Sequence, residues 1–198
     1  MKKELDFLLI DGRYGGDQNR FARFRMWRGG CSTVCACHAA ACLAAKDPSR
    51  RALSPLPGLV ITEAEFDTFS IDMFRFVYPR HRGMPTTALF QEAFQGYADH
   101  RGIPVSYRSL QGDAPTAEAE AFVRESIDAG DTIQYLLLLH AAREFNELGW
   151  HWFTVTGYEE TPDGLHIIFS TWGQRRTLPL AALWDTRREE KGGLLVIN

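Results

Sequence analysis

The chain has 198 residues, of which 45% are hydrophobic, and its formal net charge at pH 7 is −3. A chain of this length can bury a large core, and its charge balance indicates neither a nucleic-acid partner nor a disordered acidic tail. The apolar run at residues 7–10 is far too short to cross a membrane, and no secretory signal is recognisable near Met1. We therefore expect one domain over residues 1–198, with no membrane partner.

The first half of the chain is predicted to be mainly helical, after a short strand over residues 5–10 and a glycine-rich loop over residues 12–16. Alanine and leucine favour a helix that begins near Cys31, and Asp47-Pro48 ends it. Thr62 and Glu65 form the sequence pattern of a capping box. The expected helices span about 31–45, 62–76, 88–101, 116–129 and 180–184.

The second half is predicted to be rich in strands. Residues 152–157 alternate in the way that suits a half-buried strand, and Pro162-Asp163-Gly164 is typical of a tight turn. The expected strands span 104–109, 132–139, 152–157, 165–171, 174–178 and 194–197. The predicted fold class is therefore α+β, with an N-terminal helical half packed on a C-terminal antiparallel sheet.

All four cysteines, Cys31, Cys35, Cys37 and Cys42, fall in the first long predicted helix. Such a cluster cannot cross-link distant parts of a fold, so we expect reduced thiols and a cytoplasmic protein. Three of these thiols and His38 could suggest a metal site, but they would occupy different sides of one helix. Because no phosphate loop or dinucleotide fingerprint appears either, we expect no metal and no cofactor.

One cysteine and one histidine stand in positions that suit nucleophilic catalysis. Cys31 follows Gly29-Gly30 at the expected start of a helix, where the helix dipole and free N–H groups lower the pKa of a thiol. His151 lies at the expected start of a strand and could complete the activation. The alternatives are a small core cysteine and a structural histidine beside aromatic residues.

These residues, with the order of elements around them, resemble the papain-like cysteine peptidases, and among them the bacterial peptidase C39-like group. The shared order is a Cys-led helix, further helices, a helix that ends in Gly130 before an apolar strand, and a strand that His151 opens. The segment from Ser170 to Gly173 is similar to the Asn-Ser-Trp-Gly segment of papain-type enzymes. The resemblance covers most of the chain and implies a papain-like fold.

The resemblance also implies roles for individual residues. Cys31 would be the nucleophile and His151 the base, together as a thiolate–imidazolium pair. Ser170 would orient His151, with Thr171 and Gln174 as local rivals for that role. An oxyanion donor would come from the Cys31 backbone N–H and from a side-chain amide, for which the sequence offers Gln18 or Asn19.

The expected function is that of a cysteine hydrolase, a peptidase that cleaves a peptide or a short protein segment. The same chemistry could transfer an acyl group to an amine. A second hypothesis is a catalytically inactive papain-like domain that binds a peptide, because Ser170 stands where papain-type enzymes have Asn. A third is a cysteine-based metal or redox module.

Overall fold

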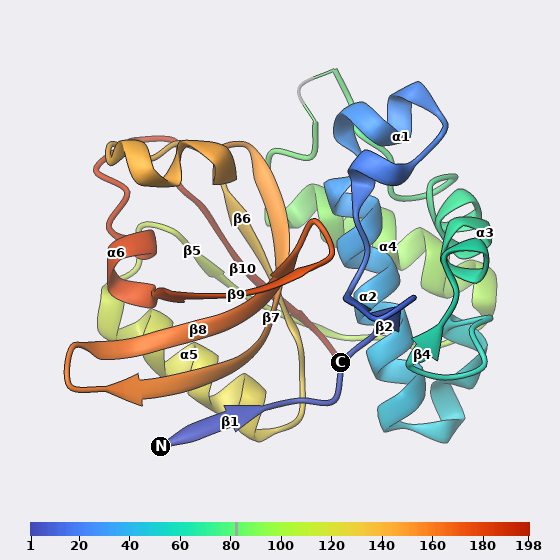
Figure 1. The fold of residues 1–198 in the computed structure, drawn as a ribbon, viewed down its shortest axis with the longest axis horizontal. Coiled ribbons are helices and arrows are strands. Elements are labelled where there is room, and N and C mark those ends of the chain that lie inside the picture. Colours follow the sequence, from blue (N-terminus) through green and yellow to red (C-terminus); the bar gives the residue numbers. More distant parts are fainter. Residues whose placement is uncertain (82) are drawn as a thin grey trace.

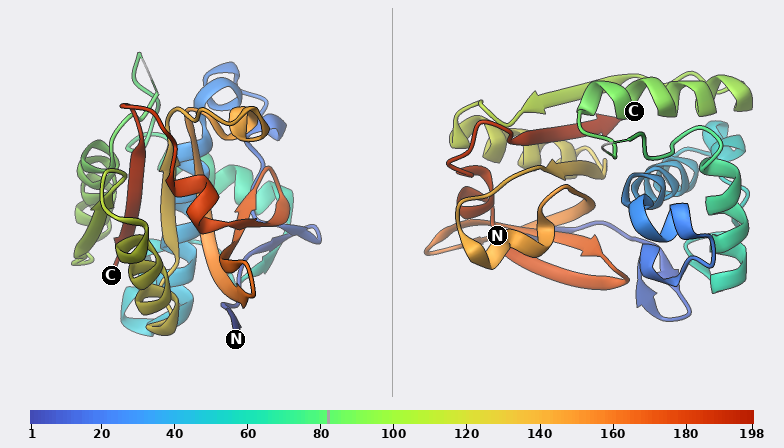
Figure 2. Two further views of the ribbon diagram at one scale, coloured as in Figure 1. Left: turned by 90° about the vertical axis from the view of Figure 1, so that its left-hand side faces the viewer. Right: turned by 90° about the horizontal axis from the view of Figure 1, so that it is seen from above.

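The two halves of the chain form two layers that lie side by side (Figure 1). The structure is a computed structural model, and it describes residues 1–81 and 83–198. The helices of the first half gather on one side, and the strands of the second half form a large sheet on the other. Figure 2 shows the sheet in front of the helices in its left panel and beside them in its right panel. The α+β class predicted from the sequence is confirmed.

Local signals in the sequence set the helix ends. Thr62 Oγ1 accepts a hydrogen bond from the Glu65 N–H, and the Glu65 carboxylate accepts one from the Thr62 N–H, which completes the capping box. Gly102, at φ 69°, ends a later helix in the left-handed conformation. No helix in the two described ranges is long and apolar enough to cross a bilayer. The helices are α1 (Phe24–Gly29), α2 (Cys31–Lys46), α3 (Glu63–Met73), α4 (Thr87–Arg101), α5 (Thr116–Asp128) and α6 (Leu180–Trp184), with 3-10 turns η1 (Gln18–Arg20), η2 (Pro48–Leu53) and η3 (Arg143–Leu148).

The main sheet has seven strands, and all of its pairs are antiparallel. Its order is β5-β10-β6-β7-β8-β9, and β1 pairs with β7 beyond a bulge between Val155 and Gly157. A small second sheet has the order β3-β2-β4. The strands are β1 (Lys2–Glu4), β2 (Leu9–Ile10), β3 (Arg13–Tyr14), β4 (Val60–Ile61), β5 (Tyr107–Gln111), β6 (Ile133–Leu137), β7 (His151–Thr161), β8 (Gly164–Thr171), β9 (Gln174–Pro179) and β10 (Gly192–Ile197).

Several details differ from the sequence prediction, among them three that have a clear physical reason. Of the strand expected over residues 5–10, only Leu9–Ile10 forms a strand, because the chain leaves the edge of β7 at Leu5 and pairs again only at β2. The strand expected over 104–109 lies at 107–111, where its register with β10 places it. The helix α1 was not expected, because its six residues are too few to show a helical period.

Alternation along the strands divides the core into two clusters, one on each face of the sheet. On β10, Leu195 packs with the helical half, whereas Leu194 and Val196 pack with α5 and α6. On β6, Leu136 faces the helical half, and Tyr135 faces the other side. Helix α2 packs against this sheet and is almost entirely buried. Its side chains are mostly small, and they allow the helix and the strands to approach closely.

Candidate active site

A direct junction between two helices places Cys31 at the start of α2. Helix α1 ends at Gly29, Gly30 is the N-cap of the next helix, and Cys31 begins it. A Cβ on Gly30 would clash with the backbone carbonyl of Met26, so the junction requires a glycine. Cys31 thus lies at the positive end of a 16-residue helix, as the sequence predicted.

The imidazole of His151 lies at the first residue of β7 and is buried, with 7% of its surface exposed. The residue before it, Trp150, has a φ of 55°, a left-handed value that costs free energy in a bulky residue. The Trp150 N–H donates to the Leu138 carbonyl at 2.8 Å, which holds this turn on the end of β6. The strained turn fixes the direction in which β7 begins, and with it the direction of His151.

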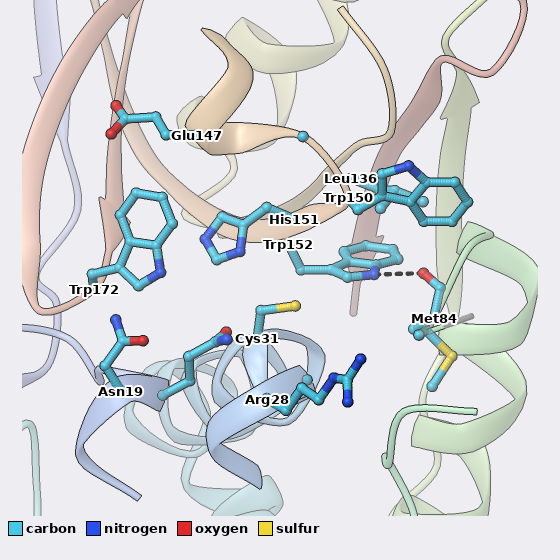
Figure 3. A pocket seen from close by; sticks show the side chains of 14 residues that line it. Asn19, Arg28, Cys31, Met84, Leu136, Glu147, Trp150, His151, Trp152 and Trp172 are labelled. Atoms are coloured by element: carbon cyan, nitrogen blue, oxygen red, sulfur yellow. Dashed lines mark hydrogen bonds between the residues drawn. The ribbon is translucent and has the colours of Figure 1, made fainter. Parts of the chain in front are cut away.

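The contact between α2 and β7 explains how Cys31 and His151 come level with one another. Further along both elements, Nδ1 of His38 lies 3.0 Å from Oγ1 of Thr154. Cys31 precedes His38 by seven residues of helix, and His151 precedes Thr154 by three residues of strand. Both intervals span about 10 Å, so Cys31 and His151 lie at a similar height along the contact between α2 and β7. Both side chains point into the same cavity (Figure 3).

The same contact belongs to a buried network that locks α2 to the sheet. The Gly16 N–H donates to Nε2 of His38 at 2.9 Å, so the proton of this ring is on Nδ1, which donates to Thr154. The Thr154 hydroxyl donates in turn to Oε1 of Gln134 at 2.8 Å. Burial lowers the pKa of His38 to about 3, so the ring is neutral. His38 is a structural residue that positions the other two.

Two residues at the β8–β9 turn hold the His151 ring. Oγ1 of Thr171 lies 2.7 Å from Nε2 of His151, and the Trp172 indole stacks on the imidazole with centroids 4.5 Å apart and an interplanar angle of 22°. Trp172 has a φ of 49° and Gly173 a φ of 71°, as a two-residue hairpin turn requires. Asn or Gly usually takes the first of these positions, and here a strained tryptophan takes it and covers the imidazole.

The expected role of Ser170 in orienting His151 needs a correction. Oγ of Ser170 donates to the Tyr14 carbonyl at 2.7 Å, on the side of β8 that faces the N-terminal segment. Successive side chains of a strand point to opposite faces, so only Thr171, its neighbour, reaches the imidazole. Gln174, the other rival, is paired with Thr171 across the hairpin.

The two amides proposed as oxyanion donors, Gln18 and Asn19, both line the cavity that contains Cys31. The Gln18 amide donates to the Trp27 carbonyl at 3.2 Å, and its Oε1 is buried without a hydrogen-bond partner among the described residues. The amide nitrogen has two N–H groups and only one of them donates to a described residue, so the second is available to a bound group.

The cavity has a volume of about 740 Å³, which suits a small ligand or a few residues of a peptide. Sequence reasoning did not find the residues that complete its walls, because they belong to loops far apart in the chain. Figure 3 shows Glu147 and Arg28 on opposite sides of it. Its lining consists of Gln18, Asn19, Arg28, Gly29, Cys31, Gly83, Met84, Leu136, Glu147, Gly149, Trp150, His151, Trp152 and Trp172.

Burial controls the protonation of the Cys31–His151 pair. It raises the pKa of the Cys31 thiol, although backbone N–H groups of Trp152, Ser32 and Cys31 itself act in the opposite direction. It lowers the pKa of His151 to about 3, with a further contribution from the charge of Arg176. Both directions favour a neutral thiol and a neutral imidazole on the lining of the cavity, rather than the expected thiolate–imidazolium pair.

The remaining cysteines of α2 are also free thiols; Cys35 and Cys37 are buried, and Cys42 is half-buried. Burial raises the pKa of Cys42 to about 12 and raises the pKa of Cys35 and Cys37 as well, so these thiols are poor nucleophiles. Among the described residues, no three His, Cys, Asp or Glu side chains gather as a metal site.

Cys31, His151 and Trp172 line one cavity, and Thr171 contacts the imidazole, so a thiol and an imidazole, the groups that nucleophilic acyl chemistry uses, face the same space. Nδ1 of His151 has no hydrogen-bond partner in the described part of the chain, so it is available as a base. No protein-family model and no curated protein matches this sequence. The geometry of Cys31, His151 and Thr171 is therefore the basis on which a function is proposed.

Proposed function

We propose that this protein is a cysteine hydrolase with a papain-like arrangement, a peptidase that cleaves a peptide or a short protein segment. The observation that carries the proposal is the convergence of Cys31 and His151 on one cavity, although 120 positions separate them in the chain. The resemblance to the C39-like peptidases further supports it, because a Cys-led helix packs against an antiparallel sheet in which His151 is the first residue of strand β7.

The neutral pair supports a mechanism in which His151 acts as a general base during the attack. Nδ1 of His151 takes the thiol proton while Sγ of Cys31 forms a bond to the substrate carbonyl carbon. The Nε2–H donates to Thr171 and thereby stabilises the imidazolium that forms. The imidazolium then gives its proton to the leaving amine, and a thioester remains on Cys31.

In the second half-reaction, water hydrolyses the thioester with the help of the same groups. His151 takes a proton from water, the resulting oxygen attacks the thioester carbonyl, and Cys31 leaves as the thiol. The N–H of Cys31 and the free N–H of Gln18 are the donors that support the oxyanion. An amine in place of water would give acyl transfer by the same path.

Hydrolysis of a fluorogenic peptide library by the purified protein tests the proposal. We expect Cys31→Ala and His151→Ala each to abolish hydrolysis, and the double variant to be no worse than either, because the two residues act as one unit. Cys42→Ala is the matched control, since this thiol belongs to the same helix and lies apart from the cavity lining. Full activity of the Cys31→Ala protein would refute the proposal.

A second candidate function is peptide binding without turnover. It is favoured by the neutral state of the pair and by Thr171, whose neutral hydroxyl stabilises an imidazolium less than a carboxylate does. In that case the library would show peptides that bind the cavity, whereas hydrolysis would stay at the level of the Cys31→Ala protein.

A further inference from the structure

One segment of the chain beside the cavity, residues 18–30, is rich in arginine and contains no Asp or Glu. Between Asp17 and Asp47 the chain has no Asp or Glu, although the whole protein carries 25 acidic and 22 basic residues. Arg20, Arg23, Arg25 and Arg28 all fall within η1, α1 and the short link between them. The local charge of this segment is therefore opposite in sign to the net charge of the protein.

The arginines of α1 also differ from most others in having no anionic partner. Arg20 pairs with Glu63, Arg175 with Glu4 and Arg176 with Glu147. By contrast, the guanidinium groups of Arg23, Arg25 and Arg28 make no ion pair or hydrogen bond to any of the described residues. Arg25 and Arg28 are three positions apart on one short helix, so their like charges repel unless an anion lies between them.

Two exposed aromatic side chains accompany these arginines. Phe24 is 65% exposed and Trp27 46% exposed, and their rings stack on each other with centroids 5.9 Å apart. A solvated aromatic pair beside arginines is a combination that is enriched in binding surfaces, where aromatic and guanidinium groups supply most of the binding energy. We refer to Arg23, Phe24, Arg25, Trp27 and Arg28 as the α1 surface.

The α1 surface is continuous with the candidate active site. Arg28 and Gly29 line the cavity, and Cys31 follows after a single residue. Helix α1 lies at the edge of the molecule above the start of α2 (Figure 1). On the opposite wall of the cavity, Glu147 pairs with Arg176, so Arg28 is the charged residue among the described lining residues that has no ion-pair partner.

We propose that the α1 surface binds an acidic, partly apolar segment of the peptide substrate and leads it into the cavity. Carboxylates of that segment pair with Arg25 and Arg28, and an apolar side chain covers Phe24 and Trp27. This inference rests on the proposed function for the identity of the substrate. Its occupant is a peptide, rather than a nucleic acid or a membrane, because the surface opens on a cavity that holds a nucleophile for acyl groups.

The binding step is tested without turnover, in the full-length Cys31→Ala protein. The probes are a fluorescein-labelled peptide of glutamate, leucine and glycine, and the same peptide with lysine in place of glutamate. We expect the acidic probe to bind and the basic probe to bind at least tenfold more weakly. We expect the affinity for the acidic probe to fall as salt is raised, because exposed charges are screened.

Charge reversal locates the binding surface. Arg25→Glu with Arg28→Glu is expected to weaken binding of the acidic probe about tenfold or more. Arg188→Glu is the matched control, because this arginine is also exposed and has no ion pair in the described ranges but lies near β10. A thermal melt of each variant verifies that it is folded. Equal loss of binding in the control, or none in the α1 variant, would overturn the proposal.

Hydrolysis and binding assays together distinguish a failure of the α1 proposal from a failure of the proposed hydrolase function. If the wild-type protein hydrolyses acidic and basic peptides at equal rates, the hydrolase stands and the α1 proposal fails. If nothing is hydrolysed but the acidic probe binds through Arg25 and Arg28, the α1 surface stands and the hydrolase fails. Arginine-dependent binding of single-stranded RNA or of phosphatidylglycerol vesicles, with no binding of the acidic peptide, would also overturn the α1 proposal.

Discussion

At the scale of single residues, the proton on Cys31 determines how the site responds to pH. Burial raises the pKa of this thiol and lowers that of His151 to about 3, so both groups are neutral near pH 7. The rate of alkylation follows the thiolate fraction. As long as the pH is below the thiol pKa, this fraction increases about tenfold for each unit by which the pH is raised. We expect the reaction of Cys31 with iodoacetamide to be slow at pH 6 and to accelerate steadily to pH 9.

Mass spectrometry of the labelled peptides gives this rate for each cysteine. Cys42 provides the internal control, because burial raises its pKa to about 12 and it should react more slowly than Cys31 throughout. A rate at Cys31 that is already high at pH 6 and flat up to pH 8 would instead indicate a preformed thiolate–imidazolium pair.

The hydroxyl of Thr171 is a second residue-scale determinant, since it contacts Nε2 of His151. Thr171→Val keeps the shape of the side chain and removes the hydrogen bond, so we expect kcat/KM for peptide hydrolysis to fall about tenfold. Thr171→Ser should restore most of it. Ser170→Ala removes a bond to the Tyr14 carbonyl and should cost about 1 kcal/mol of stability while retaining hydrolysis. A larger loss of activity from Ser170→Ala than from Thr171→Val would return the orienting role to Ser170.

Trp172 should separate stability from activity. Its left-handed backbone suits asparagine better than tryptophan, so Trp172→Asn relieves strain while it removes the ring that covers His151. We expect little change in melting temperature and a roughly tenfold lower kcat/KM, because the lost ring stacking contributes about 1 kcal/mol, similar to a single hydrogen bond. Arg187→Asn is the control, because Arg187 also has a left-handed φ, of 51°, but does not belong to the cavity lining. It should relieve strain and leave hydrolysis unchanged.

At the scale of elements, the α1–α2 junction depends on Gly30. A Cβ there would meet the Met26 carbonyl, which is backbone and cannot turn aside. We expect Gly30→Ala to lower the free energy of unfolding by about 1 to 3 kcal/mol and to displace Cys31 from the cavity. Urea denaturation and the alkylation rate of Cys31 measure the two effects.

Gly96 offers a matched glycine in the interior of a helix. It lies in α4, where a Cβ would meet only Phe76 at 3.8 Å. Gly96→Ala should therefore stabilise the protein by about 0.5 to 1 kcal/mol, as alanine does in an unobstructed helix. Opposite signs for the two substitutions would support the junction argument, whereas equal stabilisation would contradict it.

At the scale of the whole molecule, two buried neutral histidines couple stability to pH. His38 and His151 have folded pKa values of about 3, below the ordinary value of 6.5, so the unfolded chain takes up protons first as the pH falls. Stability is therefore fully present above about pH 6.5 and is lost as the pH falls toward 3. Each histidine contributes a slope of about 1.4 kcal/mol per pH unit within that window.

Urea denaturation at pH 7.5, 6, 5 and 4.5 measures this slope. We expect the free energy of unfolding to be highest at pH 7.5 and to decrease with growing slope through pH 6, 5 and 4.5. His38→Gln removes one of the two titrating groups, so its stability should depend less steeply on pH than that of the wild-type protein. A variant with the wild-type slope would show that His38 is not a source of the pH dependence.

Local patterns in the chain were sufficient to predict much of this protein. Helix propensity and the capping box predicted the positions of α2 and α3, alternation predicted β7, and the turn at residues 162–164 predicted the start of β8. These features depend on neighbours within a few residues, and such interactions can be read along a sequence. The same local signals placed Cys31 at a helix start and His151 at a strand start, where the structure has both.

Only the tertiary structure decided which hydroxyl meets the imidazole and in which state the pair is protonated. A shift of one residue along a strand turns a side chain to the other face, so Thr171 and Ser170 cannot be distinguished until the register of β8 and its turn is known. Likewise, the pKa of Cys31 and of His151 is determined by the segments that bury them, and these come from distant parts of the chain. Local sequence carries no information on either, because both depend on contacts that form only when α2 packs against β7.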